Sequence, residues 1–123
     1  VLEDGDEVVG YAYAGSHASR AAYQWSADVS IYVAPHAHRT GAGRLLYRSL
    51  LDILRRQGLH RAFAGIALPN EASVALHEAL GFSAVGVYRE VGYKFGAWRD
   101  VGYWQIALLD SAPGPVVAFP DLA

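Results

Sequence analysis

A short glycine-containing segment near the middle of the chain constrains the fold more than any other stretch. An alternating apolar run ends at Val33, Pro35 interrupts it, and residues 39–44 read RTGAGR. Leucines then recur at the spacing of one helix face until Gly58, a residue typical of helix ends. The sequence therefore predicts a strand, a basic turn with two glycines, and a helix that begins at about residue 41.

This turn has the chemistry of an anion-binding loop. The first N–H groups of a helix have no backbone partner and carry partial positive charge, so they attract phosphate groups. Gly41 and Gly43 allow close approach to the backbone, and Arg39 and Arg44 add full charges. The segment lacks the lysine of a P-loop and the third glycine of a dinucleotide fingerprint. A pyrophosphate is therefore the favoured ligand, and a glycine-rich turn without any ligand remains the alternative.

Periodicity along the rest of the chain predicts the order β-β-β-α-β-α-β-β. The residues DGDE at positions 4–7 indicate a turn between two strands, and Asn70 is expected to cap a second helix that ends near Gly81. Two β-rich runs follow, at residues 84–93 and 101–108. We expect one α/β (α+β) domain on a mixed sheet over residues 1–110, and an extended tail over residues 111–123.

Composition narrows the class of protein. The 123 residues are 53% hydrophobic with a net charge of −2, which fits one globular domain and gives no general attraction to nucleic acid or membranes. Cysteine is absent, so disulfides, thiolate metal sites and acyl-cysteine intermediates are excluded. No signal peptide or membrane-spanning run is visible, and we expect a cytoplasmic protein.

Three segments of the chain resemble the GNAT superfamily of acyl-CoA-dependent N-acyltransferases. Residues 38–43 are similar to the signature Gln/Arg-x-x-Gly-x-Gly/Ala, with His38 in place of the usual first residue. Residues 68–82 and 92–105 add two further matches, and the second of them resembles the phosphinothricin-type acetyltransferases. The likeness covers about residues 1–109. It implies a GNAT-like sheet that is mixed but mostly antiparallel, with flanking helices.

The resemblance implies acetyl-CoA as co-substrate. In the superfamily the central strand pairs with the pantetheine arm, the glycine turn holds the pyrophosphate, and an asparagine of the second helix touches the cofactor arm. The residues at the matching positions are Ile31, Tyr32, Val33, Arg39, Thr40, Gly41, Ala42, Gly43, Arg44 and Asn70. We expect no metal, because His36 and His38 form only a weak pair without a clear third ligand.

The same resemblance implies two catalytic groups. Phosphinothricin-type enzymes carry a histidine in the second helix and a glutamate on the central strand, and the matching positions are His77 and Asp28. Neutral imidazole accepts a proton near physiological pH. Asp28 is one methylene shorter than glutamate, and we expect it to assist through a water molecule. The alternatives are a histidine at the edge of the core and a carboxylate that faces solvent.

The acceptor implied by the resemblance is a small amino-acid-like amine, such as phosphinothricin, methionine sulfoximine or methionine sulfone. Arg20 and Lys94 can pair with its anionic groups, and Tyr23 can donate from its hydroxyl. A loop arginine and a packing tyrosine are the alternatives. We also expect a homodimer, with residues 98–104 and the tail as contacts, and we interpret Tyr47 as a core or dimer residue.

The chain contains no methionine, even at position 1, and it opens inside a hairpin-like pattern. Superfamily members usually begin with a further strand and two helices, so we expect a fragment or processed form that lacks them. This leaves a second hypothesis of another class, in which the chain binds CoA as a catalytically incomplete fragment or a sensor.

Overall fold

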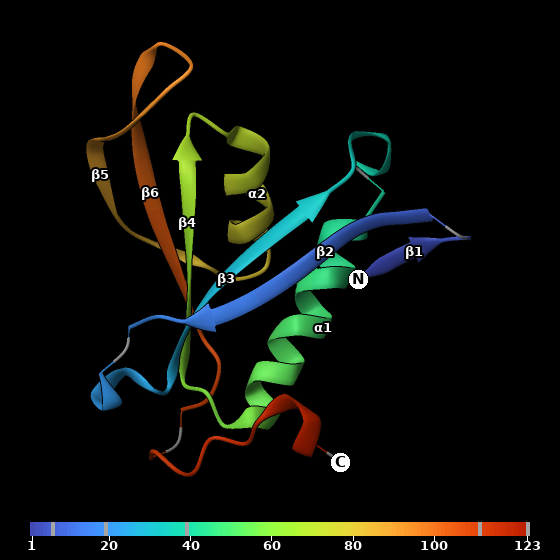
Figure 1. Cartoon of the computed structure of the whole chain (residues 1–123), viewed down its shortest axis with the longest axis vertical. Helices are drawn as coiled ribbons and strands as arrows, with labels where there is room; N and C mark the ends of the chain where they lie inside the picture. Colours follow the sequence, from blue (N-terminus) through green and yellow to red (C-terminus); the bar gives the residue numbers. More distant parts are fainter. Residues whose placement is uncertain (6, 19, 39, 111, 123) are drawn as a thin grey trace.

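A computed structural model describes residues 1–5, 7–18, 20–38, 40–110 and 112–122. Six strands form one sheet in the order β1-β2-β3-β4-β6-β5 (Figure 1). The elements are β1 (Leu2–Asp4), β2 (Glu7–Ser16), the 3₁₀ turn η1 (Ala21–Tyr23), β3 (Ser26–Val33), the 3₁₀ turn η2 (Pro35–Ala37), α1 (Ala42–Gln57), β4 (Arg61–Leu68), α2 (Glu71–Ala79), β5 (Ser83–Lys94), β6 (Ala97–Ala107) and the 3₁₀ turn η3 (Phe119–Asp121).

The predicted order of strands and helices is confirmed. Strand pairs are antiparallel except for β3 and β4, which are parallel and are joined through α1. The sheet is therefore mixed and mostly antiparallel, as expected. The bounds of the last two strands differ from the prediction. Strands β5 and β6 are longer than predicted, and only Phe95 and Gly96 connect them. Both residues have positive φ (53° and 75°), the backbone conformation that matches a two-residue hairpin turn to the twist of its strands.

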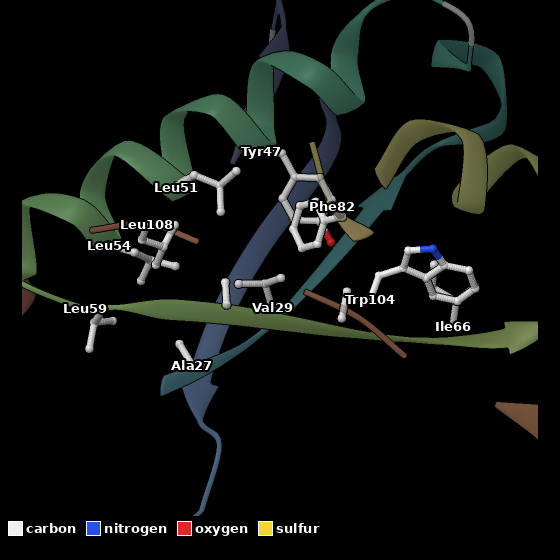
Figure 2. Packing of buried hydrophobic residues seen from close by; sticks show 12 residues of the cluster. Ala27, Val29, Tyr47, Leu51, Leu54, Leu59, Ile66, Phe82, Trp104 and Leu108 are labelled. Atoms are coloured by element: carbon white, nitrogen blue, oxygen red, sulfur yellow. The ribbon is translucent and has the colours of Figure 1, made fainter. Parts of the chain in front are cut away.

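Helix α1 has the ends that its glycines predict. Gly41 precedes it with φ 87°, and Gly58 follows it with φ 92°, both left-handed conformations that glycine adopts without steric cost. The buried side of α1 presents Tyr47, Leu51 and Leu54 to the sheet (Figure 2). Burial of this stripe fixes α1 across the strands, and it thereby places the glycine turn at the end of β3.

Both helices pack on the same face of the sheet. The core contains Ala27 and Val29 of β3 and Trp104 of β6. Leu76 of α2 and Leu80, the residue that caps its end, pack against it. Alternate residues of the strands point to the opposite face, which we call the open face. On it lie Tyr11, Tyr13 and Tyr32, all exposed, with the rings of Tyr11 and Tyr32 stacked 5.4 Å apart.

The described part of the tail packs along the end of the domain. Val117 donates its N–H to the carbonyl of Gln57 at 2.9 Å, and the indole of Trp25 donates to the carbonyl of Gly114 at 2.8 Å. The segment is mostly extended, with the short turn η3 near its end. None of the helices described here has the length and apolar character required to cross a membrane.

Candidate active site

The site begins where strands β3 and β4 separate. Their parallel pairing covers only Ser26, Ala27 and Asp28 against residues 61–63, and beyond it the two strands diverge (Figure 1). A cleft of about 190 Å³ lies at this opening. It is lined by Val29, Ser30 and Ile31 of β3, Ala64, Gly65, Ile66 and Ala67 of β4, Tyr47 of α1, and Asn70, Ser73 and His77 from the start of α2 onward. Strands that diverge leave peptide groups that need partners, so the opening suits a ligand with amide groups.

His77 lies in the wall of this cleft and is the buried residue of α2, with 2% of its surface exposed. Its Nδ1 donates to the carbonyl oxygen of Ser73 at 2.7 Å, and its Nε2 accepts from the hydroxyl of Tyr47 at 2.8 Å. A backbone carbonyl only accepts, so it determines the neutral tautomer with the proton on Nδ1. Burial lowers the pKa of His77, and the bond to Ser73 opposes that shift.

Tyr47 belongs to the site although the sequence indicated only a core or dimer contact. Its side chain is fully buried between α1 and the sheet, beside Phe82 (Figure 2). Its ring centroid lies 5.0 Å from that of His77 and 5.9 Å from that of Phe82. Burial raises the pKa of Tyr47 above its ordinary value, so the hydroxyl keeps its proton and can donate it. The sequence signal that could have indicated this position is the tyrosine hydroxyl, because the other residues on the buried side of the helix are apolar.

Asp28 lies on the other side of the sheet from His77. It alternates with the buried residues Ala27 and Val29, so its side chain is on the open face. Its Oδ1 contacts Nδ1 of His17 at 2.6 Å. Sequence reasoning missed His17, because the partner of Asp28 depends on how the chain turns after β2. The structure does not bring Asp28 and His77 together.

The glycine turn leads into α1 as predicted, but its two glycines have different surroundings. A Cβ atom at Gly41 would meet nothing within 4 Å, whereas one at Gly43 would lie 2.9 Å from Leu76. Gly43 therefore permits close contact between α1 and α2, and Gly41 leaves an open approach. Thr40 donates its hydroxyl to the carbonyl of Ala37 at 2.5 Å. Arg39, the other predicted cation of the turn, lies outside the described residues.

The positions of the remaining residues predicted to bind the cofactor are determined by the strand or helix on which each one lies. Ile31 lines the cleft, while the side chain of Tyr32 is on the open face and the carbonyl of Val33 accepts from Nε2 of His38 at 2.8 Å. Asn70 lines the cleft and caps α2 by accepting from the Ser73 N–H at 3.1 Å. Ala42 and Arg44 occupy the first turn of α1, with Ala42 buried and Arg44 exposed.

The predicted acceptor residues do not form one group. Arg20 and Tyr23 share the turn before β3, where the Tyr23 N–H donates to the Arg20 carbonyl at 3.0 Å, and both side chains are exposed. Lys94 is at the tip of the β5–β6 hairpin, its Nζ 5.1 Å from the centroid of Phe95, at the opposite end of the molecule in Figure 1. The grouping of Lys94 with Arg20 is wrong, because β5 continues to Lys94 and moves it to the hairpin tip.

His36 and His38, the weak pair of candidate metal ligands, have other partners. Nε2 of His36 lies 3.8 Å from Oε1 of Glu7, and His38 donates to the backbone. Within the described ranges, no three His, Cys, Asp or Glu side chains gather closely enough to hold a metal ion.

Comparison with known proteins gives three kinds of match. Residues 1–102 match the family described as the acetyltransferase (GNAT) domain. Phosphinothricin N-acetyltransferase from Streptomyces coelicolor is 49% identical over 102 residues, which make up 83% of this chain and 60% of that protein. L-methionine sulfoximine/L-methionine sulfone acetyltransferase from Salmonella typhimurium is 38% identical over 112 residues, 91% of this chain and 66% of that protein.

Solved structures agree with the sequence matches. A GNAT superfamily phosphinothricin acetyltransferase from Sinorhizobium meliloti, in complex with acetyl-CoA, has a TM-score of 0.85 at 34% identity and covers 92% of this chain and 63% of its own. The structure of yncA from Salmonella typhimurium with its cofactor acetyl-CoA has a TM-score of 0.87 at 38% identity. That match covers 91% of this chain and 65% of the other.

The chain spans 60% of the length of the Streptomyces phosphinothricin N-acetyltransferases that it matches. The family match nevertheless extends over most of the 123 residues, and it includes the divergent strands, the glycine turn and both helices. The chain belongs to the GNAT acetyltransferase family.

Proposed function

We propose that this protein transfers the acetyl group of acetyl-CoA to the amine of a small amino-acid-like substrate by direct attack. The observation that carries the proposal is the cleft between β3 and β4 with the His77–Tyr47 pair in its wall. The relatives named for acetylation of phosphinothricin and of methionine sulfoximine or sulfone support the same substrate class.

The residues at the cleft fit the parts of acetyl-CoA. Backbone groups of residues 31–33 can pair with the amides of the pantetheine arm, because β3 has separated from β4 there. The first N–H groups of α1, with Arg44 beside them, suit the pyrophosphate, and Asn70 reaches the cleft for the arm. Arg39 joins this set on its sequence position alone. Acetyl-CoA supplies an acetyl group activated as a thioester.

His77 and Tyr47 can move a proton on the side of the cleft that the two helices cover, which we call the helix face. The Tyr47 hydroxyl can accept a proton from the reacting nitrogen while it passes its own proton to Nε2 of His77. The resulting imidazolium donates from both nitrogens, to Tyr47 and to the Ser73 carbonyl, so neither N–H lacks a partner. Return of the proton by the same route neutralises the departing sulfur.

The choice of an acidic amino acid rests on Arg20. Its guanidinium is exposed on the turn before β3, and a cation there favours an acceptor that carries an anionic group. A polycationic acceptor would require clustered carboxylates, and on the described part of the open face Asp28 is paired with His17 instead.

The test is thiol release from acetyl-CoA, measured with the protein as its gene encodes it. The acceptors are the twenty amino acids, phosphinothricin, methionine sulfoximine, methionine sulfone, a polyamine, an aminoglycoside and a peptide. We expect the three analogues to give the highest kcat/KM. Arg20→Gln should raise KM for them, because it removes the cation, whereas Arg48→Gln on the exposed side of α1 should not. Preference for the polyamine, aminoglycoside or peptide would contradict this acceptor class.

A second candidate is a CoA-binding chain without turnover. It is favoured by the open face, where three tyrosines are exposed and no described element covers them. Calorimetry with acetyl-CoA separates the two candidates, because binding without thiol release for any acceptor would support the second one.

We also propose a homodimer that forms through the β5–β6 edge. Strand β5 is one of the two edge strands of the sheet, and the side chains along it are almost all exposed. Large apolar residues on this edge are Val85, Val87, Tyr88, Val91, Tyr93, Phe95 and Trp98. Exposed apolar edges of this kind mark sites of association. Trp104, expected from the sequence to be a dimer contact, is instead buried in the core with 7% exposed.

Light scattering at micromolar concentration should give twice the monomer mass. Val91→Lys, on the edge, should reduce that mass to the monomer value because it places a charge in the contact, whereas Val8→Lys, exposed on β2, should not. A monomer mass for the unchanged protein would contradict the dimer.

A further inference from the structure

A histidine and a carboxylate form a pair on the open face, next to the strand positions at which the cleft begins. Nδ1 of His17 lies 2.6 Å from Oδ1 of Asp28, and the His17 ring packs on Phe63 with centroids 4.6 Å apart. Asp28 and Phe63 are partners in the last step of the pairing between β3 and β4. The next residues on the two strands, Val29 and Ala64, line the cleft. The His17 ring therefore lies where the cleft begins.

The carboxylate determines how the His17 ring can act. An ionised aspartate only accepts hydrogen bonds, so Nδ1 of His17 carries the proton and Nε2 carries a lone pair. Among the described residues, Nε2 has no recorded protein partner. Asp28 also favours the imidazolium that forms when Nε2 takes up a proton, because opposite charges attract. This is the arrangement of a general base held by an acidic partner.

The His77–Tyr47 pair is not placed to perform the same step. It is buried on the helix face, and Nε2 of His77 already accepts from Tyr47. The side chain of His17 is 39% exposed and that of Asp28 is 53% exposed, on the face that the helices leave uncovered. A charged ammonium ion can reach this face while it is still hydrated. The two histidines thus lie on opposite faces of the sheet, His77 in the wall of the cleft and His17 beside the strand pair from which the cleft opens.

We propose that Nε2 of His17 removes the first proton from the incoming ammonium ion, and that Asp28 is a positioning residue that acts through His17. This inference rests on the proposed acetyl transfer. It assigns the carboxylate of β3 a histidine partner from the turn after β2, in place of a water molecule shared with His77.

The protons balance in this scheme. An ammonium group loses two protons when it becomes a secondary amide. The first passes to Nε2 of His17, which later releases it to solvent. The nitrogen lone pair then forms the C–N bond to the acetyl carbon, the C–S bond breaks, and the sulfur leaves with the electron pair. The second proton passes through Tyr47 and His77 to that sulfur.

Kinetics of matched variants test the assignment. His17→Phe keeps a ring against Phe63 but removes Nε2, and we expect turnover to fall about 10²–10⁴-fold with an unchanged Kd for acetyl-CoA. His36→Phe is the control, because His36 is another exposed histidine near a carboxylate, 3.8 Å from Glu7. It should leave turnover unchanged. An exposed ion pair contributes little to stability, so these variants should all fold.

Two variants of Asp28 test its role as the partner of His17. The ring of His17 contacts Asp28 on β3 and Phe63 on β4, and of these two only Asp28 is charged. Asp28→Asn should therefore lower kcat, because it takes the acidic partner away from Nδ1 of His17, with a smaller loss than His17→Phe and an unchanged Kd for acetyl-CoA. Asp28→Glu should restore kcat.

NMR of the His17 ring nitrogens without acetyl-CoA gives a readout that does not depend on activity. Their chemical shifts should report a proton on Nδ1 in the parent and lose that preference in Asp28→Asn, and unchanged shifts would overturn the pairing. Parent turnover in His17→Phe would overturn the role of His17 and leave acetyl transfer intact. A parent protein that releases no thiol with any acceptor would overturn both the proposed function and this inference.

Discussion

Replacing His77 by phenylalanine is expected to lower turnover about 10²–10⁴-fold, the usual contribution of a general acid–base group. The substitution keeps a ring beside Tyr47 and Phe82 but removes the nitrogen that accepts the Tyr47 hydroxyl. The Kd for acetyl-CoA, measured by calorimetry, should remain unchanged. Tyr47→Phe should also reduce turnover, because it interrupts the path from the cleft to His77. The double variant should lose little more than His77→Phe alone, since the two side chains act as one unit.

The pH dependence of turnover in the unchanged protein gives a second test of His77. Because burial lowers the pKa of His77, its neutral form persists to lower pH than in an exposed histidine, and the loss of turnover assigned to His77 follows that lowered pKa. Stability changes in the same direction. As pH falls below 6.5, the unfolded chain binds a proton at this position before the folded chain does, so the free energy of unfolding decreases. Parent turnover in His77→Phe would remove His77 from the mechanism.

Leu51→Ala is expected to reduce the free energy of unfolding by about 2–5 kcal/mol, the range measured for removal of a buried leucine side chain. Leu51 is 3% exposed and projects from α1 into the main core (Figure 2). Leu45→Ala is the control on the same helix, because Leu45 is 54% exposed, and its effect should stay within about 0.5 kcal/mol. Urea unfolding measures both. Equal effects would contradict the packing of α1 described above.

Much of the architecture could be predicted because its signals are local. The order of the elements, the glycine ends of α1 and the cap at Asn70 depend on residues within a few positions of one another. Their physical causes are backbone conformation, capping and the period of the apolar residues. The family likeness extends over the same segments, so it pointed to the central strand and the glycine turn as well.

The site was harder to predict because its contacts join residues that are distant in the sequence. Tyr47 and His77 are 30 positions apart and meet only because α1 and α2 pack on one face. His17 and Asp28 are 11 positions apart, and their contact depends on the register of β2 with β3 and on the turn between them. Neither pairing has a local pattern, which is why His17 was missed and Tyr47 was expected only as a core or dimer residue.

The sequence by itself determined the elements, their order and the family, since local backbone preferences and short motifs are sufficient for these. Tertiary structure alone decided that the two histidines lie on opposite faces of the sheet, with His77 in the wall of the cleft. Alternation along β3 directs Asp28 to the open face and Val29 to the core, and the packing of α2 then buries His77 on the other side. The helices cover one face of the sheet and leave the other exposed. The face on which a side chain lies therefore decides whether it is buried or in contact with solvent, and this determines its chemistry.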